Sequence, residues 1–272
     1  RSVELLREAV RKRLVSDVPI GAFLSGGVDS SAVVALMAEL SDQPVKTFSI
    51  GFDEEAYNEL PYARRVAEEF GCDHHEFIVQ PKAVEVLPKL VQHFGEPFAD
   101  SSAIPTSYVA ALTREHVTVA LTGDGGDEAF GGYGRHRANA LAEIFADTLS
   151  FDSIRDVVKS FARSSHGQSG MVARIKRFIH AATSTRSERY RAWAGVLSDD
   201  LISEVFPTVT ETDVTVREMF EKYRTLDAID ALLAIDTEFY LPTDLLVKMD
   251  IASMMHSLEA RSPFLDHQLV EF

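Results

Sequence analysis

The sequence has very little cysteine, since Cys72 is the single thiol among 272 residues. One thiol excludes an internal disulfide framework and a structural zinc site built from several thiolates. Apolar runs are also short, and none approaches the roughly 20 residues that a bilayer crossing requires. The charged stretch from Arg1 to Arg13 has neither the apolar segment nor the cleavage site of a secretory signal. We therefore expect no membrane span and a cytoplasmic location.

Basic residues are scarce as well. The chain has 27 lysines and arginines against 42 aspartates and glutamates, which gives a formal net charge of -15. Surfaces that bind nucleic acids are usually basic, so we expect no nucleic-acid partner. An acidic protein can still bind a nucleotide, because backbone N–H groups, a few cations and a magnesium ion hold phosphates locally. With 46% hydrophobic and 25% charged residues, the composition is that of a globular protein with a sizeable core.

Short apolar segments alternate with helix-compatible stretches in the first part of the chain. Strands are predicted at 18–24, 45–50, 75–79 and 117–122, and helices at 29–40, 58–70 and 82–93. A loop containing Pro97 and Pro105 precedes the last of these strands. Strands that alternate with helices of about ten or more residues indicate an α/β fold, with a mostly parallel sheet and helices on both faces.

The pattern changes beyond Tyr133, where strand patterns disappear and long helix-compatible stretches such as 219–241 dominate. We expect residues 1–140 to form a nucleotide-binding core and residues 141–272 to form a helical part of the same domain. The segment 150–185 gives few signals. The last residues have the pattern of the middle of a helix, so we expect the domain to be truncated at its C-terminus.

The sequence S-G-G-V-D-S at Ser25–Ser30 follows the first predicted strand and opens a predicted helix. Ligands of open α/β sheets collect at this place, where a helix N-terminus presents unpaired N–H groups. Gly26 and Gly27 allow a tight turn and a close approach of phosphate oxygens, and the serines add hydroxyl donors. Asp29 would repel a polyphosphate unless a divalent cation lay between them, so we infer Mg²⁺.

A simpler interpretation of this stretch is that Asp29 caps the helix and that the glycines only make a turn. The position between a strand and a helix favours the phosphate site. The stretch has neither the lysine of a Walker A loop, G-x-x-x-x-G-K-[ST], nor the spacing of the Rossmann sequence G-x-G-x-x-G. It therefore predicts a phosphate loop of another kind.

A second glycine-rich turn, L-T-G-D-G-G-D-E-A-F-G-G-Y at Leu121–Tyr133, follows the strand predicted at 117–122. Its acidic residues are Asp124, Asp127 and Glu128. Carboxylates beside a phosphate site again require a metal or another cation, so we expect both turns to face one site. The alternative is an ordinary turn in which Asp127 and Glu128 begin the next helix.

The stretch S-G-G-V-D-S-S resembles the pyrophosphate loop of the N-type ATP pyrophosphatases, which split ATP between its α and β phosphates. Together with T-G-D-G-G-D-E-A-F-G-G-Y and, near the end, S-L-E-A-R-S-P-F-L-D-H, it makes the sequence similar to the C-terminal synthetase domain of the glutamine-hydrolysing asparagine synthetases. These motifs lie in roughly the first 135 and the last 30 residues, and the middle matches only in its helical character. The resemblance implies a fold like that of the adenine nucleotide alpha hydrolases.

The resemblance also implies roles for individual residues. The adenosine part of ATP would lie against Leu24, Ile50, Thr122 and Gly123, and its phosphates against Ser25, Gly26, Gly27, Asp29 and Ser30. Asp29 and Asp127 would bind Mg²⁺. Asp124 would be the catalytic residue, at a position where the family commonly has glutamate in S-G-E-G-S-D-E. The aspartate keeps the carboxylate but has a shorter reach.

By this resemblance, the chain amidates aspartate to asparagine with ATP through a β-aspartyl-adenylate, and releases AMP and pyrophosphate, with ammonia supplied from glutamine. Two alternatives stay open: a related carboxylate-adenylating or β-lactam-synthetase-like enzyme with another substrate, and a regulatory domain that binds a nucleotide without turnover. An N-terminal glutaminase domain is expected to be absent from this chain, because the chain begins at Arg1 and Cys72 lies within it. The chain alone is then expected to be inactive, and a homodimer stays open.

Overall fold

The structure is a computed structural model, and it describes two compact units of the chain. The described residues are 1–52, 58–79, 83–148, 184–195, 199–206, 208 and 214–272. One unit consists of Arg1–Ala129 with Phe239–Phe272, and the other of Phe130–Glu238. Within the described ranges, every helix is too short or too polar to span a bilayer.

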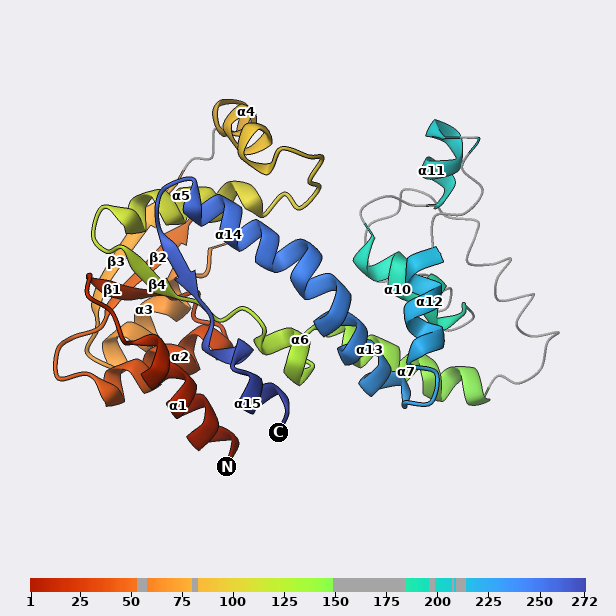
Figure 1. The fold of residues 1–272 in the computed structure, drawn as a ribbon, viewed down its shortest axis with the longest axis horizontal. Coiled ribbons are helices and arrows are strands. Elements are labelled where there is room, and N and C mark those ends of the chain that lie inside the picture. The colour runs from red at the N-terminus through yellow and green to blue at the C-terminus, as the bar shows by residue number, and fades with distance from the viewer. Residues whose placement is uncertain (53–57, 80–82, 149–183, 196–198, 207, 209–213) are drawn as a thin grey trace. The chain divides into compact units, whose positions relative to one another are not determined.

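A sheet of five parallel strands forms the centre of the first unit, in the order β3-β2-β1-β4-β5 (Figure 1). The strands are β1 (Ile20–Phe23), β2 (Lys46–Gly51), β3 (Asp73–Ile78), β4 (Val119–Leu121) and β5 (Glu259–Arg261). Ala22 of β1 lies beside Thr47 of β2 on one side and beside Leu121 of β4 on the other. The predicted α/β fold with a parallel sheet is confirmed.

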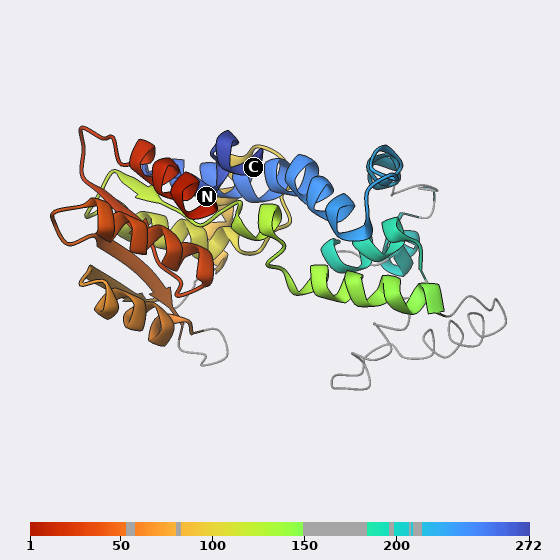
Figure 2. The ribbon, with the colours of Figure 1, turned by 90° about the horizontal axis from the view of Figure 1, so that it is seen from below.

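Helices cover both faces of this sheet (Figure 1). One face carries α1 (Ser2–Arg13), α2 (Val28–Leu40) and α3 (Leu60–Glu69), and the other carries α5 (Ala103–Arg114) and α14 (Leu246–Met254). Figure 2 shows α1 and α2, in red and orange-red, side by side on their face. Three shorter or peripheral helices complete the unit: α4 (Ala83–Phe94) contacts α5, whereas η3 (Pro263–Leu265) and α15 (His267–Val270) contact α1.

Each face of the sheet has its own apolar cluster. The cluster under α1 and α2 includes Ala22, Leu24 and Leu121. The cluster under α5 consists of Phe48, Ala110, Val117, Ala120 and Leu258. Adjacent residues of a strand point to opposite faces, which is why Ala120 and Leu121 belong to different clusters. Because both of its faces are buried, the centre of the sheet appears in the sequence as the apolar runs I-G-A-F of β1 and V-A-L of β4.

Two elements of the first unit differ from the expectation drawn from the sequence. The stretch with Pro105 is helical, because α5 begins at Ala103 and contains this proline as its third residue. Proline is tolerated there, since the first-turn N–H groups of a helix have no partner within it. The sequence pattern shows no strand beyond Tyr133, whereas the structure has β5 at Glu259–Arg261. This strand has only three residues, two of them charged, and its pairing with β4 is what identifies it.

The second unit is helical in its described parts. Its helices are α7 (Gly134–Thr148), α10 (Arg186–Ala194), α11 (Asp199–Val205), α12 (Val214–Lys222) and α13 (Ala228–Ile235). The chain passes between the units in α6 (Gly126–Phe130) and in the π-helical segment η2 (Asp236–Leu245). Nearly all of the segment 150–185 lies outside the described residues.

A buried carboxylate organises the polar interior of the second unit. Asp236 is fully buried and accepts hydrogen bonds of 2.8 Å from the Tyr190 hydroxyl, from His136 Nε2 and from the Arg135 guanidinium. Burial raises the pKa of Asp236, but the hydrogen bonds from His136 and Arg135 outweigh this effect and hold the pKa below its ordinary value. The carboxylate is therefore ionised and fixes α7, α10 and the start of η2 to one another.

Candidate functional site

The loop Ser25–Ser30 lies between β1 and α2, at the carboxyl edge of the sheet. Its own hydroxyl groups hold its shape. Ser25 Oγ and Ser30 Oγ are 3.0 Å apart, and they accept hydrogen bonds from the backbone N–H groups of Gly27 (3.2 Å) and Ser25 (3.3 Å), respectively. Gly27 is the N-cap of α2 and supplies no capping side chain, so the N–H groups of the first turn are available to an anion.

Gly26 allows α3 to pack directly against this loop. Its φ is +80°, in the left-handed region, and an added Cβ would lie 2.6 Å from the backbone of Tyr62 and Ala63. No other residue type fits such a position without displacing the start of α3. The first glycine of the motif therefore fixes the loop to its neighbouring helix.

The turn between β4 and α6 packs against the first loop through two further glycines. A Cβ on Gly126 would lie 2.4 Å from Asp29 Cγ, and a Cβ on Gly123 would lie 3.0 Å from the Ser30 nitrogen. Only residues without a side chain allow the two turns to approach so closely. The structure thus brings together the two glycine-rich turns that the sequence predicts to face one site.

Negative charge is concentrated where the two turns meet. Asp29 is partly buried, and burial together with the charges of Asp127 and Glu128 raises its pKa to about 6. Glu128 itself is only 2% exposed. Carboxylates that raise the pKa of a neighbour lie close enough to repel one another, so a cation bound among them would be stabilised.

The other residues assigned to ATP by resemblance lie on the same edge of the sheet. Leu24 is buried directly after β1, where its N–H donates to the Phe48 carbonyl (2.9 Å) and its carbonyl accepts a hydrogen bond from the Ser49 hydroxyl. Ile50 is half-buried near the end of β2, and Thr122 is buried directly after β4. The carboxyl ends of three neighbouring strands therefore place these residues together, as expected for a parallel sheet.

The chain matches the asparagine synthase family over residues 2–272. It belongs to this family. The asparagine synthetase (glutamine-hydrolyzing) 1 of Bacillus subtilis (strain 168) is 32% identical to it over 278 aligned residues, which cover 97% of this chain and 41% of that protein.

Two further relatives have similar names. The putative asparagine synthetase (glutamine-hydrolyzing) of Mycobacterium tuberculosis (strain ATCC 25618 / H37Rv) is 34% identical over 270 residues, covering 97% of this chain and 40% of the relative. The putative asparagine synthetase (glutamine-hydrolyzing) 2 of Methanocaldococcus jannaschii is 48% identical over 135 residues, or 49% of this chain and 26% of the relative. The chain spans about two fifths of the length of the relatives that it matches throughout.

The carboxylates at the junction of the two turns suit a magnesium ion, which the resemblance to the asparagine synthetases implies. Among the described residues, no group of three or more histidine, cysteine, aspartate or glutamate side chains is arranged to hold a metal alone. Mg²⁺ commonly uses only one or two protein carboxylates and completes its coordination with substrate phosphates and water. Asp29, with its raised pKa and its acidic neighbours, fits this mode, with Asp127 as the second carboxylate.

Asp124 lies in the same turn but in a different environment. Its Oδ2 is enclosed and accepts no hydrogen bond from the described part of the chain. Burial raises the pKa of Asp124 above its ordinary value, because the Thr122 hydroxyl and the positive charge of Lys248 offset only part of this rise. The hydroxyl of Ser262 donates to the Asp124 carbonyl, which fixes the backbone of the turn.

A polar cluster formed by Lys248, Asp100 and Ser102 escaped the sequence analysis. Lys248 Nζ donates to Asp100 Oδ2 and to Ser102 Oγ, both at 2.8 Å. The sequence K-M-D-I-A-S-M-M-H that begins at Lys248 suggests only core packing by its methionine spacing. The lysine itself could have indicated a buried ion pair, because a single ammonium in the apolar run L-L-V-K-M needs a buried partner.

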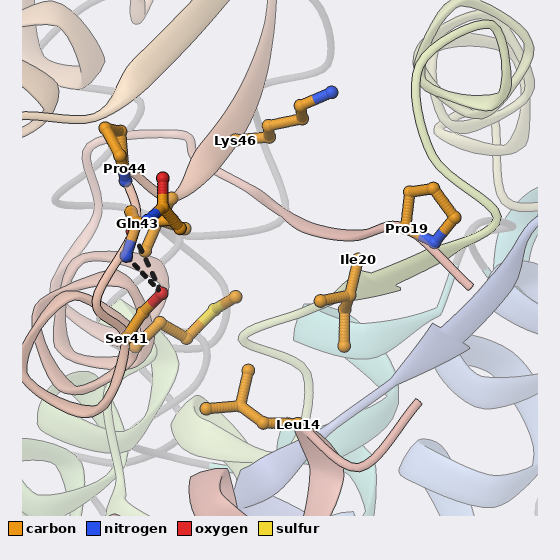
Figure 3. A pocket seen from close by; sticks show the side chains of 9 residues that line it. Leu14, Pro19, Ile20, Ser41, Gln43, Pro44 and Lys46 are labelled. Carbon is orange, nitrogen blue, oxygen red and sulfur yellow. Dashed lines mark hydrogen bonds between the residues drawn. The ribbon is translucent and has the colours of Figure 1, made fainter. Parts of the chain in front are cut away.

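The described residues also line a partly open cavity of about 250 Å³ away from these turns (Figure 3). Its lining includes Leu14, Pro19, Ile20, Pro44 and Lys46. These residues precede or begin β1 and β2, so the cavity lies at the amino edge of the sheet. It contains none of the residues predicted to bind ATP or magnesium.

Proposed function

We propose that this chain is the ATP-using synthetase part of an enzyme that amidates aspartate to asparagine. The observation that carries the proposal is the packing of Asp29 against Gly126, which joins the phosphate loop to the acidic turn at one edge of the sheet. Membership of the asparagine synthase family and the names of the relatives support the choice of substrates. Ammonia would come from glutamine, because the relatives are named as glutamine-hydrolyzing.

In the first step, an oxygen of the aspartate side-chain carboxylate attacks the α-phosphorus of ATP. The bond between the α-phosphorus and the oxygen bridging to the β-phosphate breaks, so that β-aspartyl-adenylate forms and pyrophosphate leaves. The N–H groups of Ser25–Ser30 and the first turn of α2 would hold the departing pyrophosphate. A magnesium ion held by Asp29 and Asp127 would neutralise phosphate charge when bound.

In the second step, ammonia attacks the acyl carbon of the adenylate. The new carbon–nitrogen bond gives asparagine, the acyl–oxygen bond breaks, and AMP leaves with that oxygen. The attacking nitrogen loses a proton, and the Asp124 carboxylate would accept it or orient the adenylate for attack.

Exchange of labelled pyrophosphate into ATP tests the first step directly. The full-length gene product should catalyse this exchange with aspartate and not with a panel of other carboxylic acids. Asp29→Ala should abolish aspartate-dependent pyrophosphate release, because it removes one of the two carboxylates assigned to magnesium. Full activity of Asp29→Ala would show that the phosphate loop has been assigned wrongly. Exchange that depends on another acid would refute aspartate as the substrate.

A further inference from the structure

The strands β1 and β2 stop pairing where the phosphate loop begins. Their last paired residues are Phe23 and Phe48, and one further backbone hydrogen bond runs from the Leu24 N–H to the Phe48 carbonyl (2.9 Å). A parallel ladder would continue with a bond from the Ile50 N–H to the Leu24 carbonyl. This bond is not made among the described residues. The carboxyl edge of the sheet is therefore open between these two strands.

Strand β2 nevertheless continues in the sheet beyond this point. Ile50 still pairs with Phe77 of β3, and the Gly51 carbonyl accepts a hydrogen bond from the Val79 N–H on that side. Successive residues of a strand direct their peptide groups to alternate neighbours, so Ile50, like Phe48, presents its N–H and its carbonyl toward β1. Within the described ranges, neither group has a hydrogen-bond partner there. Ile50 is half-buried and thus offers one donor and one acceptor side by side.

The hydroxyl of Ser49 takes the place of the missing ladder bond. Ser49 follows the paired residue Phe48, lies opposite Leu24, and donates from its Oγ to the Leu24 carbonyl. Leu24 is 1% exposed and Ser49 is 4% exposed, so water does not replace this hydrogen bond. The hydroxyl satisfies the carbonyl that the Ile50 N–H would otherwise meet. It therefore completes the end of β1 and leaves the backbone of Ile50 free.

A free N–H beside a free carbonyl matches the chemistry of adenine. The N6 amino group of adenine is a donor, and ring nitrogens that accept hydrogen bonds, N1 and N7, lie on either side of it. Guanine has the acceptor O6 in place of this amine, and its N1 is a donor, so neither of the corresponding edges of guanine fits. The free groups lie beside the loop Ser25–Ser30, because Leu24 directly precedes that loop. A base joined to phosphates requires this proximity.

We propose that Ser49 is the positioning residue that makes the nucleotide site prefer adenine: its hydroxyl holds the Leu24 carbonyl, so that the backbone N–H and carbonyl of Ile50 bind the base. The proposal rests on the proposed function, in which ATP binds at this edge of the sheet. Ser49 itself does not touch the nucleotide. A serine with a purely structural role would satisfy the Leu24 carbonyl and have no influence on the choice of base.

Calorimetric titration of the full-length protein with nucleotides and magnesium, without aspartate, tests this role separately from turnover. The wild type should bind ATP at least tenfold more tightly than GTP. It should also bind ATP about tenfold more tightly than either 1-deaza-ATP or 7-deaza-ATP, whichever lacks the ring nitrogen that meets the Ile50 N–H. The weaker of the two analogues identifies the edge of adenine that is bound.

Ser49→Ala should abolish this discrimination. Without the hydroxyl, the Ile50 N–H bonds to the Leu24 carbonyl and is withdrawn from the base. The Kd for ATP should therefore rise about tenfold, to the value for the weaker deaza analogue, whose own Kd should stay within about threefold of its wild-type value. Ser49→Thr keeps the hydroxyl and should restore both the affinity and the discrimination.

Ser253→Ala is the matched control for the loss of a buried serine hydroxyl. Ser253 is fully buried in α14, where its hydroxyl donates to the Asp250 carbonyl (3.3 Å), and neither residue is assigned to the nucleotide. This variant should be less stable but should keep the wild-type Kd values for ATP and its analogues. A Ser49→Ala variant that likewise loses only stability, with its preference among the nucleotides unchanged, would overturn the proposal.

Ser49→Cys carries the test if Ser49→Ala does not fold, because a thiol fills a similar space but donates a weaker hydrogen bond. It should lose part of the discrimination, and unchanged discrimination would overturn the proposal. A wild type that binds ATP but releases no pyrophosphate with any acid would refute the proposed function alone. An active wild type that binds ATP, GTP and both deaza analogues equally would refute the role of Ser49 alone, and a wild type that binds no ATP would refute both.

Discussion

The repulsion among the carboxylates where the two turns meet should destabilise the ligand-free protein, and Asp29→Asn should restore this stability. Burial and then repulsion from Asp127 and Glu128 raise the pKa of Asp29 from its ordinary value of 3.8 to about 6. The folded protein therefore holds this proton more tightly than the unfolded chain does. The corresponding stability is fully present below pH 3.8 and is lost as the pH rises through about 6. Asparagine keeps the shape of the side chain and never carries the charge.

The size of this effect follows from the pKa. Each tenfold change in proton affinity corresponds to about 1.36 kcal/mol. The rise in the pKa of Asp29 from 3.8 to about 6 would therefore correspond to about 3 kcal/mol of folding free energy. The side chain is partly exposed, and solvent screening reduces the effect on stability to roughly 1 kcal/mol. The attraction between the Asp29 carboxylate and the N-terminus of α2, about 0.3–1 kcal/mol, stabilises the charged side chain in the folded protein. It therefore reduces the gain in stability expected from asparagine. We therefore expect Asp29→Asn to gain about 1 kcal/mol near pH 7.5.

Thermal unfolding in metal-free buffer measures this gain. Asp29→Asn should unfold about 2–4 °C above the wild type near pH 7.5 and at the same temperature near pH 3.5. Asp42→Asn, at an exposed position, is the control and should match the wild type at both pH values. With MgATP added, the wild type should unfold at a higher temperature than Asp29→Asn, because the variant should bind MgATP poorly. Equal unfolding temperatures across the whole pH range would refute the repulsion at the junction of the turns.

Two further variants test other parts of the structure. Gly126→Ala should lower stability by about 1–3 kcal/mol and pyrophosphate release by at least tenfold, because its Cβ would lie 2.4 Å from Asp29 Cγ. Gly134→Ala is the control in both assays, since a Cβ on Gly134 would meet no atom within 4 Å. If Gly126→Ala behaved like Gly134→Ala, the close approach of the two turns would be contradicted. Asp236→Asn should lower stability by about 3–5 kcal/mol, because the Arg135 charge loses its buried counterpart. An unfolding temperature equal to that of the wild type would show that this carboxylate does not organise the second unit.

The architecture around the phosphate loop was largely predictable from the sequence, because the physics that determines it is local. Apolar runs bounded by glycine indicate buried parallel strands, and such strands end at the same edge of a sheet. This rule alone brings Ser25–Ser30 close to the turn that contains Asp127. The glycines at positions 26, 123 and 126 then allow the contact. The chemical roles of the residues stay predictions until the reaction is measured.

Contacts between distant segments were not predictable in this way. Lys248 and Asp100 are far apart in the sequence, and one lies in an apolar helical pattern while the other lies in a proline-containing stretch that favours a loop. Local spacing carries no information about which buried cation meets which carboxylate. The same reason explains why β5 was not predicted. Its three residues, two of them charged, have no strand pattern in the sequence, and only their pairing with β4 identifies the strand.

The pairing of β4 with β5 also has a consequence for how the protein is made. Val119 pairs with Glu259, so the sheet joins segments that are synthesised long apart. A nascent chain that has emerged as far as Tyr133 already contains both glycine-rich turns, but it has neither the fifth strand nor Lys248. Contacts between such distant segments form slowly, and the exposed edge of β4 is open to wrong partners meanwhile. The carboxyl edge of the sheet is therefore completed only after β5 has been synthesised, which makes its assembly a late event in biosynthesis.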